Sequence, residues 1–250
     1  MVLHQELERR LAAFTNTEAA LVFPTGYHAN LGIISALMGP GDLILGDALN
    51  HASIIDGCRL SRAHVQVFRH NDMTHLAQLL TACPQSGQRL IVTDSVFSMD
   101  GDVAPLVDIV TLARCHNAWV MVDEAHATGV FGVHGAGVVE ELGLENEVEI
   151  QMGTLGKALG GFGAYVAGSR ELIEWLINRA RSFIYTTGVP PAVTASALAA
   201  LDIVAQEPER RQQLWDNAAF LRQGLETLGY TLGSTRSPIL PVIIGEAHQT

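Results

Sequence analysis

Short apolar runs alternate with amphipathic stretches along most of the chain. The apolar runs predict strands over Ala19–Phe23, Leu43–Leu45, Val65–Phe68, Leu90–Thr93, Trp119–Val122, Glu149–Met152 and Ala164–Ala167. The stretches between them predict helices over Asn30–Met38, Ala52–Leu60, Thr74–Ala82, Leu106–Cys115, Val138–Leu142 and Glu171–Arg181. Strands such as Trp119–Val122 are apolar on both faces, as in a parallel sheet covered by helices on each side. The alternation predicts a doubly wound α/β domain that collects ligands at the carboxyl ends of its strands.

The pattern changes near residue 205. A helical run over Pro191–Val204 is followed by a long amphipathic helix over Glu209–Leu228 and by one apolar strand over Ile239–Ile244. A single terminal strand has nothing of its own to pair with. We therefore expect a large domain over residues 1–205, and a connecting helix with the beginning of a smaller domain over residues 206–250.

Composition and charge argue against nucleic-acid-binding, membrane-spanning and disulfide-rich proteins. A net charge of −11 argues against a nucleic-acid partner, which would need a basic face. No apolar run is long enough to cross a bilayer, and the first ten residues lack the order of a signal peptide. Cys58, Cys83 and Cys115 are widely spaced and form no CxxC, which favours neither disulfides nor zinc. We expect a protein of the reducing cytoplasm.

The chain contains a single lysine among its fifteen basic residues. Lys157 lies in the glycine-rich run Gly153–Gly161. Arginine stays protonated, whereas a lysine of lowered pKa can attack a carbonyl and form a Schiff base. The alternative is a leftover surface lysine in a glycine turn.

The acidic string Asp123–His126 follows an apolar strand, where α/β enzymes keep their chemistry. A nucleotide-hydrolysing motor would need GxxxxGK[ST] earlier in the chain, and the glycine run here has the wrong spacing and comes later. A metal site is not favoured, because there is no HExxH and the histidines form no tight ligand pair. The remaining interpretation is a pyridoxal-phosphate site, in which Asp123 keeps the ring nitrogen protonated near His126 and upstream of Lys157.

A pyridoxal-phosphate site also needs a phosphate cradle. The segment Thr25–Asn30 follows a strand and opens a helix, so its free N–H groups and the helix dipole would bind a dianion. The alternative is that Gly26 serves only as a turn residue and that Tyr27 is an exposed aromatic at a helix start.

Two more polar residues begin segments that follow strands. His51, in Asn50–Ser53, is placed to stack on a flat ring, although a histidine at a helix start is more often a solvated surface residue. Ser98 lies in Phe97–Asp102, for which the alternative is an ordinary polar turn, because Asp-Gly is a turn signal.

Taken together, these segments resemble the α-oxoamine synthases, which are fold-type-I pyridoxal-phosphate enzymes that join an amino acid to an acyl thioester with loss of CO2. The resemblance runs from Leu7 to about Val204. It rests, in the family's order, on TGYHAN (25–30), NHAS (50–53), HNDMTHL (70–76), VFSMDGD (96–102), MVDEAHATGVFG (121–132) and GTLGKALGG (153–161). It implies a mostly parallel seven-stranded sheet with helices on both faces.

Two segments look most like the biotin-synthesis branch of this family. They are Asp100–Leu106 and Ala125–Gly129. Glycine C-acetyltransferase, also called 2-amino-3-ketobutyrate ligase, tends to have Asn-Leu where Pro105 and Leu106 stand, and 5-aminolevulinate synthase usually has Val in place of Thr128. The resemblance therefore implies L-alanine and a pimeloyl thioester, carried by acyl carrier protein or CoA, as substrates of a homodimer.

The resemblance also implies roles for individual residues. Lys157 would carry the cofactor and then act as base, Asp123 would pair with the pyridine nitrogen, and His51 would stack on the ring and face the substrate. Five further positions would hold the cofactor: His126 and Ser98 at its phenolic oxygen, and the backbone of Gly26 and Tyr27 with the hydroxyl of Thr154 at its phosphate. Thr186 or Thr187 would reach the phosphate of a neighbouring subunit.

The chain departs from the family at both ends. Family members carry a segment before Leu3 with a substrate-binding arginine, and a full C-terminal domain beyond Ile244 that helps to close the acyl site. We expect the chain to be the cofactor domain of a longer enzyme. Another α-oxoamine synthase, a transaminase and a catalytically incomplete binding subunit remain as alternatives, although the intact set of Lys157, Asp123 and His126 argues against the last.

Overall fold

The computed structural model describes residues 1–82, 87–233 and 235–245. All seven predicted strands are present, as β1 (Ala19–Phe23), β2 (Leu43–Asp47), β3 (His64–Phe68), β4 (Arg89–Asp94), β5 (Trp119–Asp123), β6 (Ile150–Thr154) and β7 (Ala164–Gly168). They form one sheet in the order β1-β7-β6-β5-β4-β2-β3. Strands β3, β2, β4, β5 and β6 are parallel to one another, and β7 is antiparallel to both β6 and β1. The predicted fold class is confirmed.

The predicted helices are also present, with small changes of boundary. They are α2 (Gly26–Leu37), α3 (Ala52–Ser61), α4 (Met73–Ala82), α5 (Leu106–Cys115), α6 (Val138–Glu141), α7 (Arg170–Arg179), α9 (Pro191–Gln206) and α10 (Glu209–Thr227). Helices α1 (Val2–Phe14) and α8 (Arg181–Ile184) were not predicted. Helix α2 begins at Gly26 rather than Asn30, because the side chain of Thr25 accepts a hydrogen bond from the N–H of His28 and caps the first turn.

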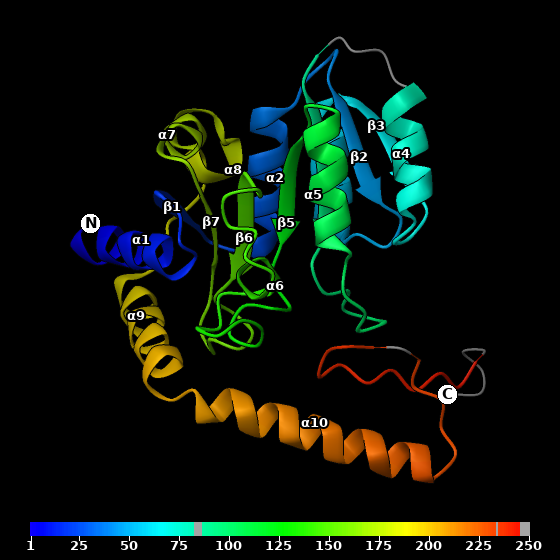
Figure 1. Cartoon of the computed structure of the whole chain (residues 1–250). Coiled ribbons are helices and arrows are strands. Elements are labelled where there is room, and N and C mark those ends of the chain that lie inside the picture. The colour runs from blue at the N-terminus through cyan, green and yellow to red at the C-terminus, as the bar shows by residue number, and fades with distance from the viewer. Residues whose placement is uncertain (83–86, 234, 246–250) are drawn as a thin grey trace.

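Helices cover both faces of the sheet (Figure 1). On one face, alternate residues such as Ile44 and Met121 pack against α2, α3 and α7. On the other face, Leu45 and Val122 pack against α4 and α5. The period-two alternation of a strand sends neighbouring residues to opposite faces, which explains why these strands are apolar throughout. A third cluster joins α1 and α9 to β1 and β7.

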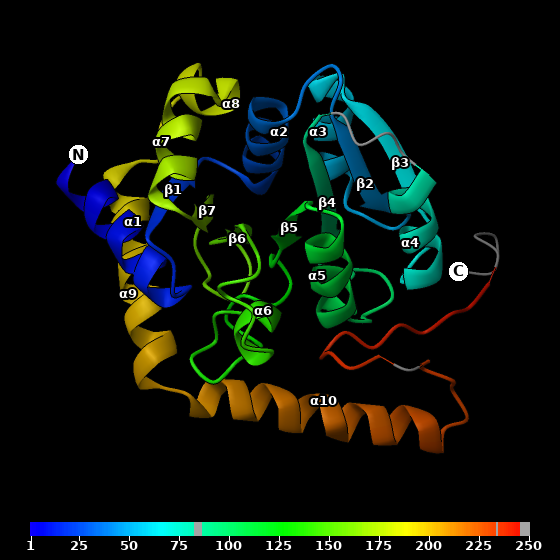
Figure 2. The same ribbon diagram turned by 45° about the horizontal axis from the view of Figure 1, so that its top comes forward.

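Helix α10 leaves the layered part of the molecule and runs along one end of it to the C-terminal segment, in both views (Figures 1 and 2). None of its residues is buried. No helix of the described residues combines the length and the apolarity needed to span a membrane.

The predicted strand over Ile239–Ile244 is wrong, since these residues form no helix or strand. The tail contacts the layered part of the molecule through side chains just before this run and at its first residue. The hydroxyls of Thr235 and Ser237 donate to the carbonyl of Gly101 at 2.5 and 2.7 Å, and Ile239 packs against the core. This contact explains the apolar residue at position 239, whereas Val242, Ile243 and Ile244 are exposed. Pro241 could not donate to a ladder in any case.

Candidate active site

The carboxyl ends of four adjacent parallel strands carry polar residues. Asp47 ends β2, Asp94 ends β4, Asp123 ends β5 and Thr154 ends β6. In the register of β4 and β5, Asp94 lies directly beside Asp123. The sheet thus brings together residues that are far apart in the sequence, at the edge where the alternating pattern predicted a ligand site.

Asp123 is the most completely enclosed of the predicted site residues, with 3% of its surface exposed. One carboxylate oxygen accepts from the backbone N–H of Ala125 at 2.9 Å, and the other accepts from the side-chain amide of Asn30 at 2.8 Å. Burial raises the pKa of Asp123, while these two hydrogen bonds and the charge of Lys157 oppose the shift. A positive group bound at this carboxylate would offset the cost of its burial.

Asp94 is a site residue that the sequence reasoning missed. It is 5% exposed, and its carboxylate accepts from the backbone N–H of His51 at 2.9 Å. Burial, and then the neighbouring Asp123, raise the pKa of Asp94 to about 8. Its place directly after the predicted strand Leu90–Thr93 was the signal that could have identified it.

The amine of Lys157 lies 2.7 Å from Nε2 of His126. Burial lowers the pKa of Lys157, and the carboxylates of Asp123 and Asp94 oppose that shift. Burial, followed by the positive charges of Lys157 and His51, lowers the pKa of His126 to about 4. His126 is therefore neutral near pH 7, and its Nε2 can accept a hydrogen bond from the lysine or, in the other tautomer, donate one to it.

His51 caps the N-terminus of α3, and its Nδ1 lies 2.7 Å from the hydroxyl of Ser53. Its backbone N–H is bound to Asp94. The imidazole is otherwise exposed. The structure therefore places the predicted histidine at the same edge of the sheet as Asp94 and Asp123.

The predicted phosphate cradle lies at the start of α2, against strand β6. A Cβ added to Gly26 would come within 3.1 Å of the methyl group of Met152 in β6. The first amides of a helix, here those of Gly26 and Tyr27, have no intrahelical acceptor. The phenol of Tyr27 is engaged elsewhere, since it donates to Asp56 at 2.7 Å. The hydroxyl of Thr154 donates to the carbonyl of Gly163 at 3.1 Å.

The loop that carries Ser98 also contains Asp102, and His70 joins Asp102 to Asp47 at the end of β2. Nδ1 and Nε2 of His70 lie 2.8 and 2.7 Å from carboxylate oxygens of Asp47 and Asp102. Burial lowers the pKa of His70, but the hydrogen bonds to Asp47 and Asp102 outweigh it, so that the net pKa is raised. Ser98 itself is exposed, and no hydrogen bond links its side chain to the rest of the described chain.

Two predicted residues lie away from this cluster. Thr186 and Thr187 follow α8, where Thr186 is half-buried and Thr187 is exposed. Within the described residues, no hydrogen bond joins them to Asp123, His126 or Lys157.

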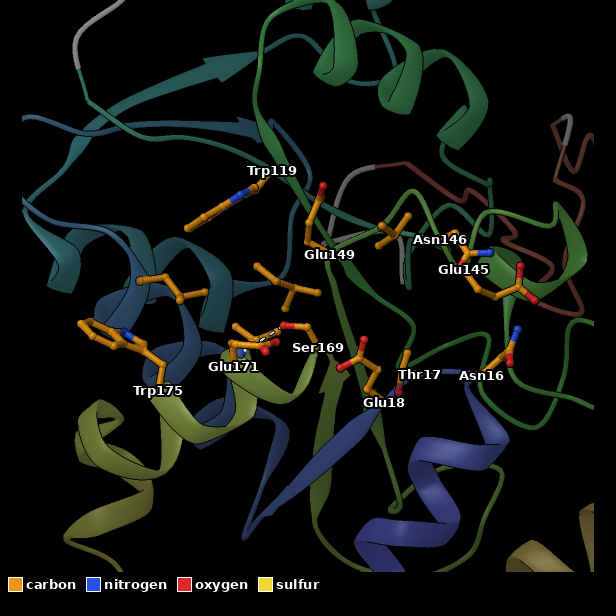
Figure 3. A pocket seen from close by; sticks show the side chains of 15 residues that line it. Asn16, Thr17, Glu18, Trp119, Glu145, Asn146, Glu149, Ser169, Glu171 and Trp175 are labelled. Carbon is orange, nitrogen blue, oxygen red and sulfur yellow. Dashed lines mark hydrogen bonds between the residues drawn. The ribbon is translucent and has the colours of Figure 1, made fainter.

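A separate cavity of about 870 Å³ contains none of the predicted site residues. Figure 3 shows Trp119 and Trp175 at one end of it and Glu145 and Asn146 at the other. Two of its four carboxylates serve the fold, because Glu18 accepts from the backbone N–H of Arg170 and Glu149 accepts from that of Val120. Among residues 1–82, 87–233 and 235–245, no cluster of His, Cys, Asp and Glu is arranged to hold a metal ion.

The family model for aminotransferase class I and II matches residues 1–250 of the chain. The chain belongs to this family. Within it, the α-oxoamine synthase resemblance seen in the sequence is confirmed by named relatives. A putative 8-amino-7-oxononanoate synthase of Halalkalibacterium halodurans is 54% identical over 98% of the chain, and 8-amino-7-oxononanoate synthase 1 of Bacillus subtilis is 49% identical over 98%.

Solved structures of similar proteins agree with the fold. A serine palmitoyltransferase from S. paucimobilis, with bound PLP and myriocin, superposes on 99% of the chain with a TM-score of 0.95 and 39% identity, and the chain covers 65% of it. An 8-amino-7-oxononanoate synthase from Francisella tularensis gives a TM-score of 0.86 at 33% identity, with 99% of the chain and 72% of that structure covered. The chain spans 62% of the length of both curated relatives named above.

Proposed function

We propose that the chain is the cofactor-binding part of an 8-amino-7-oxononanoate synthase, which condenses L-alanine with a pimeloyl thioester and releases CO2 and the thiol carrier. The observation that carries the proposal is the contact of the Lys157 amine with His126, beside the buried carboxylates of Asp123 and Asp94. The names of the relatives at 49–54% identity support this substrate pair over those of other α-oxoamine synthases. We place the reaction in the cytoplasm, in a homodimer.

The residues at the carboxyl edge fit pyridoxal phosphate. Asp123 is buried, lacks a cationic partner at hydrogen-bond distance among the described residues, and would hold the positive ring nitrogen. The amides of Gly26 and Tyr27 with the hydroxyl of Thr154 would hold the phosphate. His126 and Ser98 would bind the phenolic oxygen, and His51 would stack on the ring. Thr186 or Thr187 would reach the neighbouring subunit's phosphate.

Bound pyridoxal phosphate supplies an electron sink for a carbanion at the α-carbon of the amino acid. The chain's own residues then control charge and protons. A pyridinium against Asp123 would hold that carboxylate anionic despite its burial. Because the pKa of Lys157 is lowered, its amine is neutral in a larger fraction of molecules, so it can accept the α-proton and return it. His126, which is neutral near pH 7, adds no competing positive charge.

The first test is to incubate the chain with pyridoxal phosphate, reduce it with borohydride and locate the label by mass spectrometry. Lys157 is the only lysine, so it and the N-terminal amine are the two primary amines that can be modified. We expect the label on Lys157, and we expect Lys157→Arg to abolish it while labelling at Met1 stays unchanged. A label confined to Met1 in both proteins would refute the cofactor site.

The second test concerns the reaction and uses a full-length protein that contains this chain. Alanine with pimeloyl-CoA or a pimeloyl acyl carrier protein should yield 8-amino-7-oxononanoate. Formation of pyruvate from alanine without a thioester would indicate transamination instead. Product from acetyl-CoA with glycine, and none from the pimeloyl thioester, would assign the chain to glycine C-acetyltransferase. Replacing Asp123 with Asn should abolish turnover while Lys157 can still be labelled.

A further inference from the structure

The buried side chain of Asn30 joins the predicted site residue Asp123 to Ser53, which lies on a different element. Its amide nitrogen lies 2.8 Å from a carboxylate oxygen of Asp123 in β5 and 2.9 Å from the hydroxyl of Ser53 in α3. Both Asn30 and Ser53 are 1% exposed. A primary amide has two N–H groups, and both are used here.

With Asp123 ionised, hydrogen-bond chemistry assigns a direction to every bond in this chain of contacts. If the Asn30 amide were turned over, its oxygen would face the Asp123 carboxylate, and two acceptors would repel each other. Since the hydroxyl of Ser53 accepts from Asn30, its own proton is free to donate to Nδ1 of His51 at 2.7 Å. The backbone N–H of Ser53 also points to that nitrogen, at 3.2 Å. Nδ1 is therefore an acceptor, and the proton of a neutral His51 resides on Nε2.

Helix packing holds this link in place. Gly57 lies one turn after Ser53 on the same face of α3, and a Cβ added there would come within 2.9 Å of the Asn30 carbonyl oxygen. The absence of a side chain at Gly57 lets α3 approach α2 closely enough for Ser53 to reach Asn30.

Within the described residues, the Asn30 side chain makes no hydrogen bond other than these two donated bonds. Its oxygen has no hydrogen-bond partner in the described chain, although it is buried. A buried acceptor without a partner lowers the stability of the fold. The two donated bonds are therefore the feature that an asparagine supplies at this position.

We propose that Asn30 and Ser53 are positioning residues that hold the Asp123 carboxylate and the His51 ring in one frame and fix His51 as the Nε2–H tautomer. This inference rests on the proposed function for its catalytic meaning. The link orients the Asp123 carboxylate, which would hold the cofactor's ring nitrogen. It also leaves the N–H of His51 on Nε2, at the exposed edge of the imidazole that would cover the cofactor ring.

The test is nitrogen-15 NMR of the histidine side chains in the cofactor-free chain, with His51 assigned from a His51→Gln spectrum. We expect the wild-type His51 to show the Nε2–H pattern near neutral pH. Ser53→Ala should introduce a measurable fraction of the Nδ1–H form, and Ser53→Thr, which keeps the hydroxyl, should restore the wild-type pattern. Ser61→Ala is the matched control. It removes a buried hydroxyl from the same helix, but that hydroxyl donates to the carbonyl of Cys58 and not to His51.

A wild-type His51 with its proton on Nδ1 would overturn the proposal, and this measurement needs no variant. An unchanged His51 pattern in Ser53→Ala would do the same. A second measurement reports on the Asp123 carboxylate. In protein loaded with pyridoxal phosphate, Asn30→Leu removes a hydrogen bond to Asp123 and should shift the pH dependence of the cofactor's absorbance, whereas Ser61→Ala should not. Since the tautomer is read without cofactor, its outcome does not depend on whether Lys157 can be labelled.

Discussion

Glu124, the residue after Asp123, provides a quantitative test of the electrostatics of this edge. It is 2% exposed, and its carboxylate accepts from the hydroxyl of Ser95 and from the backbone N–H groups of Val138 and Val139. It therefore ties the end of β5 to the start of α6. Burial raises the pKa of Glu124 from 4.5 to about 7, and the three hydrogen bonds only partly oppose this.

The sign and size of the effect on stability follow from this pKa. The folded state holds the proton of Glu124 more tightly than the unfolded chain does, so its contribution to stability is full below pH 4.5 and is lost as the pH rises towards 7. At roughly 1.4 kcal/mol for each pH unit between the two pKa values, the loss amounts to about 3 kcal/mol. Glu124→Gln cannot ionise and should not lose this stability.

The measurement is the free energy of unfolding in urea, for wild type and Glu124→Gln, at several pH values across this window. The free energy of unfolding of Glu124→Gln minus that of wild type should increase by about 3 kcal/mol between pH 4.5 and pH 7. Buried carboxylates that do not interact with Glu124 affect both proteins alike and cancel. Glu141→Gln, an exposed position on α6, should show no such trend. If the wild-type and Glu124→Gln curves run parallel in pH, the burial argument for this edge is refuted.

Two further substitutions test the packing around the site. Gly57→Ala places a Cβ against the Asn30 carbonyl, and the resulting shift of α3 should cost about 1–3 kcal/mol in a thermal or urea melt; a variant as stable as wild type would show that the helices have room to separate. His70→Gln removes the bridge between Asp47 and Asp102. Because the pKa of His70 is raised, its stabilisation is full below its ordinary value of 6.5 and is lost as the pH rises through the folded-state pKa, so urea melts should show a larger cost at acid pH than at alkaline pH. An equal loss of unfolding free energy in His70→Gln at acid and at alkaline pH would contradict this.

Much of the site could be predicted because its residues follow strands. Lys157, Asp123 and His126 stand in short segments whose chemistry is evident from residue type and position, and the structure places their side chains at one edge of the sheet. The roles assigned to them stay a proposal. Asp94 could have been recognised in the same way, because it directly follows a predicted strand. The division of the chain near residue 205 also stays a prediction, and Cys83 lies outside the described residues.

The order of strands could not be predicted, and it decides which carboxylates meet. Hydrophobic alternation marks a strand, but it does not say which strand lies beside it. The pairing of β4 with β5 sets Asp94 against Asp123, and this neighbouring carboxylate helps to raise the pKa of Asp94. The failed strand at Ile239–Ile244 has the same cause, because an apolar run is equally compatible with a sheet and with a contact of the kind that Ile239 makes with the core.

The sequence by itself determined the seven strands, most of the helices, the fold class and the types of side chain available at the carboxyl edge, since these follow from local periodicity and from single residues such as the one lysine. The tertiary structure decided the couplings: the 2.7 Å contact of Lys157 with His126, the neighbouring buried carboxylates, and the link from Asp123 through Asn30 and Ser53 to His51. These depend on distances between segments far apart in the chain, which are fixed only when the sheet and its helices pack together.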